Sequence, residues 1–185
     1  MSRARVWRSA GACAVVAGVV AGCTAPPPDV DPRLRKAVQP VVHAALVAEV
    51  GKDGGMLGDS APASKARWFC AEKVVEIREA QDGVLRVGLD MACSELAVRG
   101  RTLVEGTGIA APWVMELSRD GKGGYRVRHQ ESPPDGAGYD DWIGRSFSEG
   151  GAEMVRHGEW QGTATLEATA RTHFRLPPEA PVTQL

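Results

Sequence analysis

Asp90 and His129 are the best candidates for acid–base chemistry in this chain of 185 residues. Asp90 lies in the run VGLDMAC, and His129 lies in a strand-like run with Tyr125 and Val127 on its own face, where it could line a sheet cavity. A carboxylate or imidazole in a cavity can exchange protons with a ligand. The alternative for Asp90 is an ion pair with Lys73 across a hairpin, which is common and contributes little. We therefore predict no catalytic residue and keep Asp90 and His129 as weak candidates.

Other motifs that could bind a cofactor or a metal lack the necessary context. The segment GTGIAA, residues 106–111, matches the dinucleotide-binding pattern G-x-G-x-x-G/A. That pattern must open a helix, whereas Pro112 and a strand-like run follow, so we expect a loop between strands and no cofactor. No G-x-S-x-G elbow is present, and the four histidines have no metal-binding spacing: His43, His129, His157 and His173. We expect no metal site.

The first 22 residues are typical of a secretory signal peptide. Arg3, Arg5 and Arg8 precede an uninterrupted run of small and apolar residues from Ala10 to Gly22, and none of the 22 is acidic. As a helix this run would rise about 20 Å, which is short of the ~30 Å hydrocarbon core of a bilayer. The sequence therefore predicts that residues 1–22 are removed.

The end of this run, Val20-Ala21-Gly22-Cys23, resembles the lipobox of bacterial lipoproteins. The resemblance implies that Cys23 carries lipid, such as palmitate, and becomes the first residue of the mature protein. An ordinary signal peptide and a short uncleaved anchor are the alternatives. Two acyl chains anchor a protein stably, so we expect it at the outer face of the cell membrane. Residues 23–32 then read as a proline-rich tether.

The mature chain is acidic and long enough for one domain. Without the three N-terminal arginines, 19 basic residues stand against 23 acidic ones, a net charge of about −4. This balance argues against nucleic-acid binding. We predict a single domain over residues 33–176 and a flexible tail over residues 177–185.

Two cysteines, Cys70 and Cys93, remain after Cys13 leaves with the signal and Cys23 is lipidated. In a compartment that permits disulfides, we predict that they pair; the alternative is two buried thiols. A hairpin supports the pairing. Runs typical of strands, residues 67–79 and 84–98, flank the turn signal at Asp82-Gly83. A four-residue loop would place Cys70 opposite Cys93 and Lys73 opposite Asp90, whereas a two-residue turn would place the cysteines diagonally.

Helices are expected on both sides of the strands in sequence. Asp31 and Pro32 are typical of a helix start, and apolar periodicity continues to about Glu49, with a kink or break at Pro40. A second hairpin is expected from residues 112–119 and 125–131. An amphipathic helix follows at residues 139–147, and another short helical piece at about residues 152–157.

This order predicts an α+β fold, with an N-terminal helix and short C-terminal helices packed on one face of a curved, four-stranded antiparallel sheet. The order resembles the NTF2-like and cystatin-like folds. Residues 68–147 also resemble a group of secreted bacterial domains without an assigned activity, through RWFCAEKVVEI, GTGIAAPWVMEL and YRVRHQESPPDGAGYDDWIGRSF. The resemblance implies a fold and no chemistry.

We expect a membrane-anchored, non-enzymatic binding or accessory module that meets an envelope protein or a small ligand. One alternative is a carrier that holds a small ligand in the concavity of the sheet. The other is an enzyme resembling NTF2-like isomerases, with Asp90 and either Tyr125 or His129 in the pocket. An interaction module predicts a filled cavity and an exposed aromatic patch, whereas a carrier needs an apolar pocket.

Overall fold

The computed structural model describes residues 26–52, 54–57 and 66–185, so Cys23 and the signal segment lie outside the described residues. The confirmed class is α+β, with a helix on a mostly antiparallel sheet followed by short helices. The elements are α1 (Pro32–Val50), β1 (Arg67–Glu79), β2 (Leu85–Arg99), β3 (Thr102–Arg119), β4 (Tyr125–Glu131), α3 (Tyr139–Ser146), α4 (Glu149–His157), α5 (Gly162–His173) and β5 (Val182–Gln184).

The first hairpin has the register that the four-residue loop predicts. Cys70 lies opposite Cys93 and forms a disulfide with it, and Lys73 lies opposite Asp90. Because the cysteines are direct partners on neighbouring strands, the disulfide and the hairpin hold the same register.

The connection between β1 and β2 is nevertheless one residue longer than predicted. Glu79 pairs with Leu85, and the register shifts between Val74 and Glu76. This bulge in β1 takes up the extra residue and restores the predicted pairing at the cysteines. Gly83 adopts a φ of 70° in the turn, which glycine allows without steric cost.

Residues 106–111 belong to β3, so the prediction of a loop there is wrong. Gly108 pairs with Ser94 and Ala110 with Ala92. The long partner β2 outweighs the low strand propensity of these small residues. Pro112 lies inside β3, opposite Asp90 of β2. On the other side of β3, no described strand pairs with this position, so the missing N–H of the proline removes no ladder bond there.

The sheet continues from β3 to β4 and gains a short fifth strand. β4 pairs antiparallel with Val114–Arg119, and β5 pairs parallel with Leu103–Glu105. β5 comes from the residues for which the sequence predicted a flexible tail. The sheet order is therefore β1-β2-β3-β4, with β5 beside the other end of β3.

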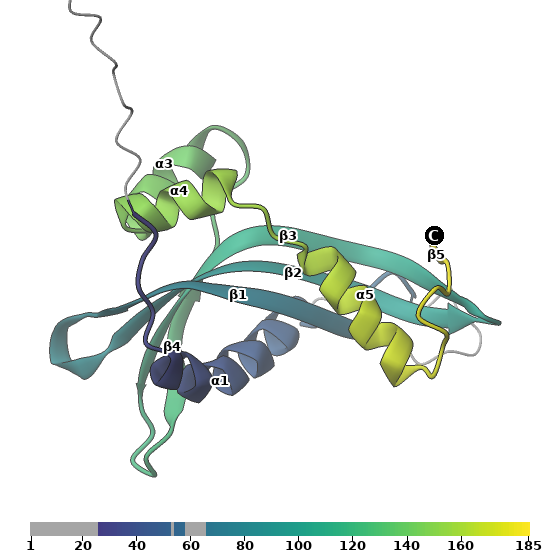
Figure 1. The fold of residues 1–185 in the computed structure, drawn as a ribbon, viewed down its shortest axis with the longest axis horizontal. Coiled ribbons are helices and arrows are strands. Elements are labelled where there is room, and N and C mark those ends of the chain that lie inside the picture. The colour runs from purple at the N-terminus through teal and green to yellow at the C-terminus, as the bar shows by residue number, and fades with distance from the viewer. Residues whose placement is uncertain (1–25, 53, 58–65) are drawn as a thin grey trace, which may run out of the picture.

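Helices cover both faces of the sheet, so the expectation that they share one face is wrong (Figure 1). α1 lies on the face toward which β4 curves, whereas α3, α4 and α5 lie on the other. Strand residues that point to either side, such as Cys70 and Ala71, belong to different apolar clusters. The sheet is the middle layer of three.

α1 begins as the sequence predicts. The carboxylate of Asp31 accepts a hydrogen bond from the backbone N–H of Arg33 at 2.8 Å, and Pro32 is the first helical residue. The helix continues through Pro40 to Val50, so the predicted break is absent. Pro40 is exposed, which allows water to reach the backbone group that loses its partner there.

Residues 26–31, which we call the strap, run from α4 to the start of α1 (Figure 1). The carbonyl oxygen of Pro26 lies so close to Gly150 in α4 that a Cβ there would be 2.1 Å from it. Val30 is buried in the apolar cluster beneath α1. The strap therefore contacts the helices on both faces of the sheet.

Candidate functional site

The concave face of the sheet is filled by α1. Val38, Val42 and Leu46 of the helix are fully buried. They share one apolar cluster with strand side chains that include Val74, Val87, Leu89, Met91, Met115 and Leu117. The helix therefore occupies the place in which a small ligand would lie.

Asp90 lies on the opposite face of the sheet from α1. Its neighbours Leu89 and Met91 pack in the cluster beneath α1, and side chains alternate along a strand. Partial burial raises the pKa of Asp90, and the Lys73 ammonium opposes this rise. Burial and the charge of Asp90 raise the pKa of Tyr139 at the start of α3. Asp90 thus has a perturbed pKa outside the concavity.

His129 and Tyr125 do not share an environment, although both lie on β4. The register of β4 shifts between Val127 and His129, which breaks the alternation of side chains. Tyr125 is buried in the cluster beneath α1, whereas His129 is exposed opposite Glu116. The predicted common face of these residues is therefore wrong, and the structure does not bring Asp90, Tyr125 and His129 together.

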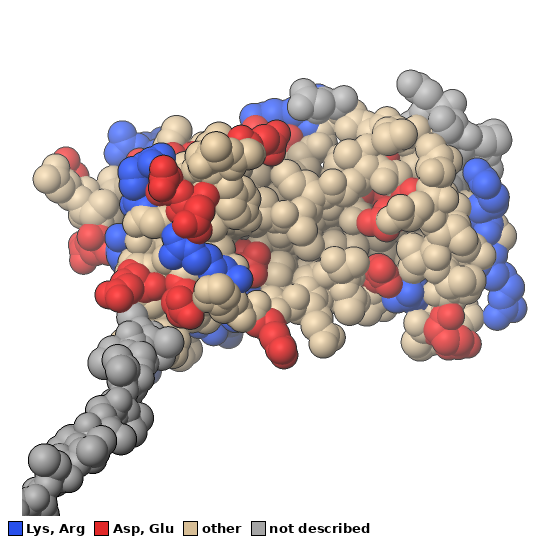
Figure 2. All heavy atoms as spheres, turned by 90° about the horizontal axis from the view of Figure 1, so that it is seen from above, with Lys and Arg blue, Asp and Glu red and all other residues tan. Residues whose placement is uncertain are grey.

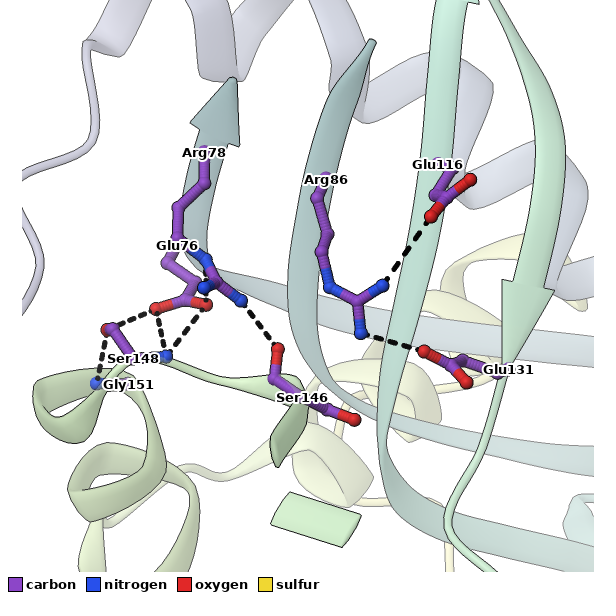
Figure 3. Close-up of polar contacts among 8 residues, drawn as sticks. All are labelled: Glu76, Arg78, Arg86, Glu116, Glu131, Ser146, Ser148 and Gly151. Carbon is purple, nitrogen blue, oxygen red and sulfur yellow. Dashed lines mark hydrogen bonds and ion pairs between the residues drawn. The ribbon is translucent and has the colours of Figure 1, made fainter. Parts of the chain in front are cut away.

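The most buried carboxylate in a polar cluster is Glu76, whose side chain is 2% exposed (Figure 3). It accepts hydrogen bonds from the backbone N–H of Ser148 at 3.1 Å and from the Ser148 hydroxyl, and it pairs with Arg78 Nε at 2.9 Å. Ser148 Oγ in turn accepts from the N–H of Gly151. The helix N-terminus and the arginine both place positive charge beside this carboxylate. This cluster fixes α4 to β1.

A second ion cluster in Figure 3 joins three neighbouring strands. Arg86 of β2 donates to Glu131 of β4 at 2.7 Å and lies 3.6 Å from Glu116 of β3. These side chains are partly exposed, so each pair stabilises the fold little. Both clusters have a structural explanation, and the sequence did not identify either.

A surface groove runs along the β1 side of the molecule, between α1 and α4. It consists of two adjoining hollows of about 530 and 340 Å³ that share Arg35, Gln39 and Glu72. Lys36 lines the larger hollow, and Trp160 the smaller. We call this the β1 groove. Sequence reasoning missed it, because β1 and α4, which are far from α1 in the chain, complete its walls.

One histidine, His43, contacts a carboxylate in this groove. Its Nδ1 lies 2.9 Å from Glu72 Oε2, and the Glu72 side chain is only 5% exposed. The hydrogen bond to Glu72 and the charge of that carboxylate raise the pKa of His43, although partial burial opposes the rise. The pair therefore satisfies the buried Glu72 carboxylate on the wall of the groove.

Aromatic side chains form no large exposed patch in the described part of the chain. Trp113 and Trp142 are buried, and Trp68 and Trp160 are half-buried. Tyr139 is 40% exposed. Figure 2 shows charged side chains gathered over the end of the molecule that α3 and α4 form, beside a largely uncharged middle. The aromatic patch that an interaction module predicts is therefore not found among these residues.

In the described ranges, no three His, Cys, Asp or Glu side chains gather closely enough to hold a metal ion. None of the described helices combines the length and apolar character that crossing a bilayer requires. The Cys70–Cys93 disulfide indicates an oxidising, extracytoplasmic compartment. No family model, curated protein or solved structure matches this chain.

Proposed function

We propose that this protein is a lipoprotein, anchored through Cys23 at the outer face of the bacterial cell membrane, which acts as a non-enzymatic binding or accessory module. The observation that carries the binding role is the filled concave face, where Val38, Val42 and Leu46 take the place of a ligand. Because described side chains fill that face, we expect the protein to interact through its surface. The disulfide and the lipobox support the compartment and the anchor.

The alternatives find less support. A carrier needs a sizeable apolar pocket, whereas the hollows of the β1 groove are open and have charged walls. An enzyme resembling NTF2-like isomerases needs its acid and base in one pocket. The β3 partners of Asp90 and His129 are four strand positions apart, about 13 Å along the strand, and the two residues lie on opposite sides of β3. The position of α1 supports kinship with the NTF2-like and cystatin-like folds at the level of architecture alone.

The test is in-membrane crosslinking of the full-length protein followed by mass spectrometry, with Cys23→Ala as the unanchored control. We expect one dominant envelope protein to be recovered with the native chain and lost with the control. Metabolic labelling with a palmitate analogue tests the anchor separately, since only the native chain should incorporate it. Scattered background crosslinks in an acylated native sample would refute the accessory role.

A further inference from the structure

The β1 groove lies along an unpaired strand edge. β1 is the outer strand of the sheet and pairs only with β2 among the described strands. Glu72, Lys73, Val74 and Val75 line the smaller hollow, so about 13 Å of strand borders it. Within the described residues, no backbone group of these four bonds to another backbone outside the sheet. The bulge between Val74 and Glu76 interrupts regular pairing beyond Val74, so the edge can accept only a short extended segment.

The groove carries more positive than negative charge. Arg35 and Lys36 lie side by side on its α1 wall, and neither side chain forms an ion pair with a described residue. The acid on its wall, Glu72, is held by His43. The two cations on α1 are thus available to an anionic ligand.

Apolar side chains form another part of the groove wall. Pro28 of the strap and Met154 of α4 line the smaller hollow together with Trp160. Methionine and tryptophan at the rim of a strand edge can cover alternate side chains of an added strand, while the main chain supplies the hydrogen bonds. A small free anion would use the cations and leave these walls unused.

We propose that the β1 groove binds a short extended peptide segment bearing acidic side chains, which adds to the edge of β1 and pairs with Arg35 and Lys36. This inference rests on the proposed binding function and names the partner chemistry of one site. The strap, which contributes Pro28 to the groove, limits the segment to a few residues. A phosphate-bearing lipid headgroup is the rival occupant.

The test uses the full-length protein in detergent and an array of acetylated hexapeptides varied at every position. We expect bound peptides to be enriched in Asp and Glu. Arg35→Gln with Lys36→Gln should weaken the best of them about tenfold, since two charge contacts are lost. The matched control, Lys122→Gln with Arg128→Gln, removes two exposed cations near the far hairpin and should leave affinity unchanged. Amide hydrogen exchange at residues 72–75 should slow when the peptide binds.

An array without acidic enrichment, or peptides that bind the Arg35→Gln, Lys36→Gln variant as tightly as the native chain, would overturn the inference. Vesicles test the rival: the Cys23→Ala chain is mixed with phosphatidylglycerol or phosphatidylcholine vesicles. A second outcome would also overturn the inference: no acidic peptides are selected, and the chain binds phosphatidylglycerol vesicles. If Arg35→Gln with Lys36→Gln abolishes this vesicle binding and the control variant does not, the groove is assigned to lipid phosphate. A crosslinked envelope partner alongside a failed array would remove this inference and leave the proposed function standing.

Discussion

Glu76→Gln should destabilise the fold by about 2–3 kcal/mol. The carboxylate accepts hydrogen bonds from the Ser148 N–H at 3.1 Å, from the Ser148 hydroxyl and from Arg78 Nε at 2.9 Å, while its side chain is 2% exposed. A hydrogen bond to a charged group contributes about 1.5–3 kcal/mol, against about 1 kcal/mol for a neutral pair, so neutralisation costs about 1 kcal/mol for each bond. Arg78 is 42% exposed and stays hydrated, which keeps the cost below that of a fully buried pair.

Guanidinium and thermal denaturation of the oxidised protein, both followed by tryptophan fluorescence, measure this change. The melting temperature should fall by about 4–12 °C. Glu116→Gln is the matched control, because its carboxylate is 38% exposed and lies 3.6 Å from Arg86. That variant should lose less than about 1 kcal/mol. Equal losses in the two variants would refute the argument that burial and the contacts with α4 make Glu76 important.

Three further predictions concern other parts of the fold. Leu46→Ala, at a side chain with no exposure, should cost about 3–4 kcal/mol in chemical denaturation, and a loss below about 1 kcal/mol would mean that α1 does not fill the concavity. Replacing Cys70 and Cys93 together by Ser should cost about 3 kcal/mol, since the disulfide closes 23 residues of chain; equal stability under reducing and oxidising conditions would contradict this. Glu72 raises the pKa of His43 above 6.5. The pair therefore contributes its full share of the free energy of unfolding below that pH, and this contribution is lost as pH rises through the folded-state pKa. Native protein should therefore exceed His43→Gln in stability by more at about pH 5.5 than at about pH 9, and a constant difference would exclude the linkage.

The first hairpin could be predicted because its signals are local. The turn at Asp82-Gly83 and the alternating strands set the pairing of Cys70 with Cys93. The length of the connection was not predicted correctly. It is one residue longer than expected, and a bulge after Val74 offsets the extra residue. A bulge depends on packing with other elements, which one strand's sequence does not encode.

Long-range contacts explain the elements that sequence reasoning missed. Gly108 and Ala110 have low strand propensity, yet they extend β3 because β2 offers a partner there. α5 was not predicted because its buried residues are only Gly162, Leu166 and Ala170, a stripe too narrow and too small to be recognised as amphipathic. The polar role of Glu76 also depends on α4, more than 70 residues later.

Candidate chemistry was harder to predict than architecture. The position of Asp90 opposite Lys73 followed from the hairpin register, but which face it occupies depends on where α1 and α3 pack. His129 was assigned to the face of Tyr125 by simple alternation, which the shift in β4 breaks. The β1 groove needs α1, β1 and α4 together, so no single segment indicates it.

The strap has a consequence for how far the proposed lipoprotein can reach. Only Thr24 and Ala25 separate Cys23 from Pro26, which already packs on Gly150. Three chain steps span at most about 11 Å, so an acylated Cys23 would hold the α4 end of the domain within that distance of the anchoring residue. So short a connection would favour partner proteins whose extracytoplasmic segments lie close to the bilayer, where confinement raises their effective concentration.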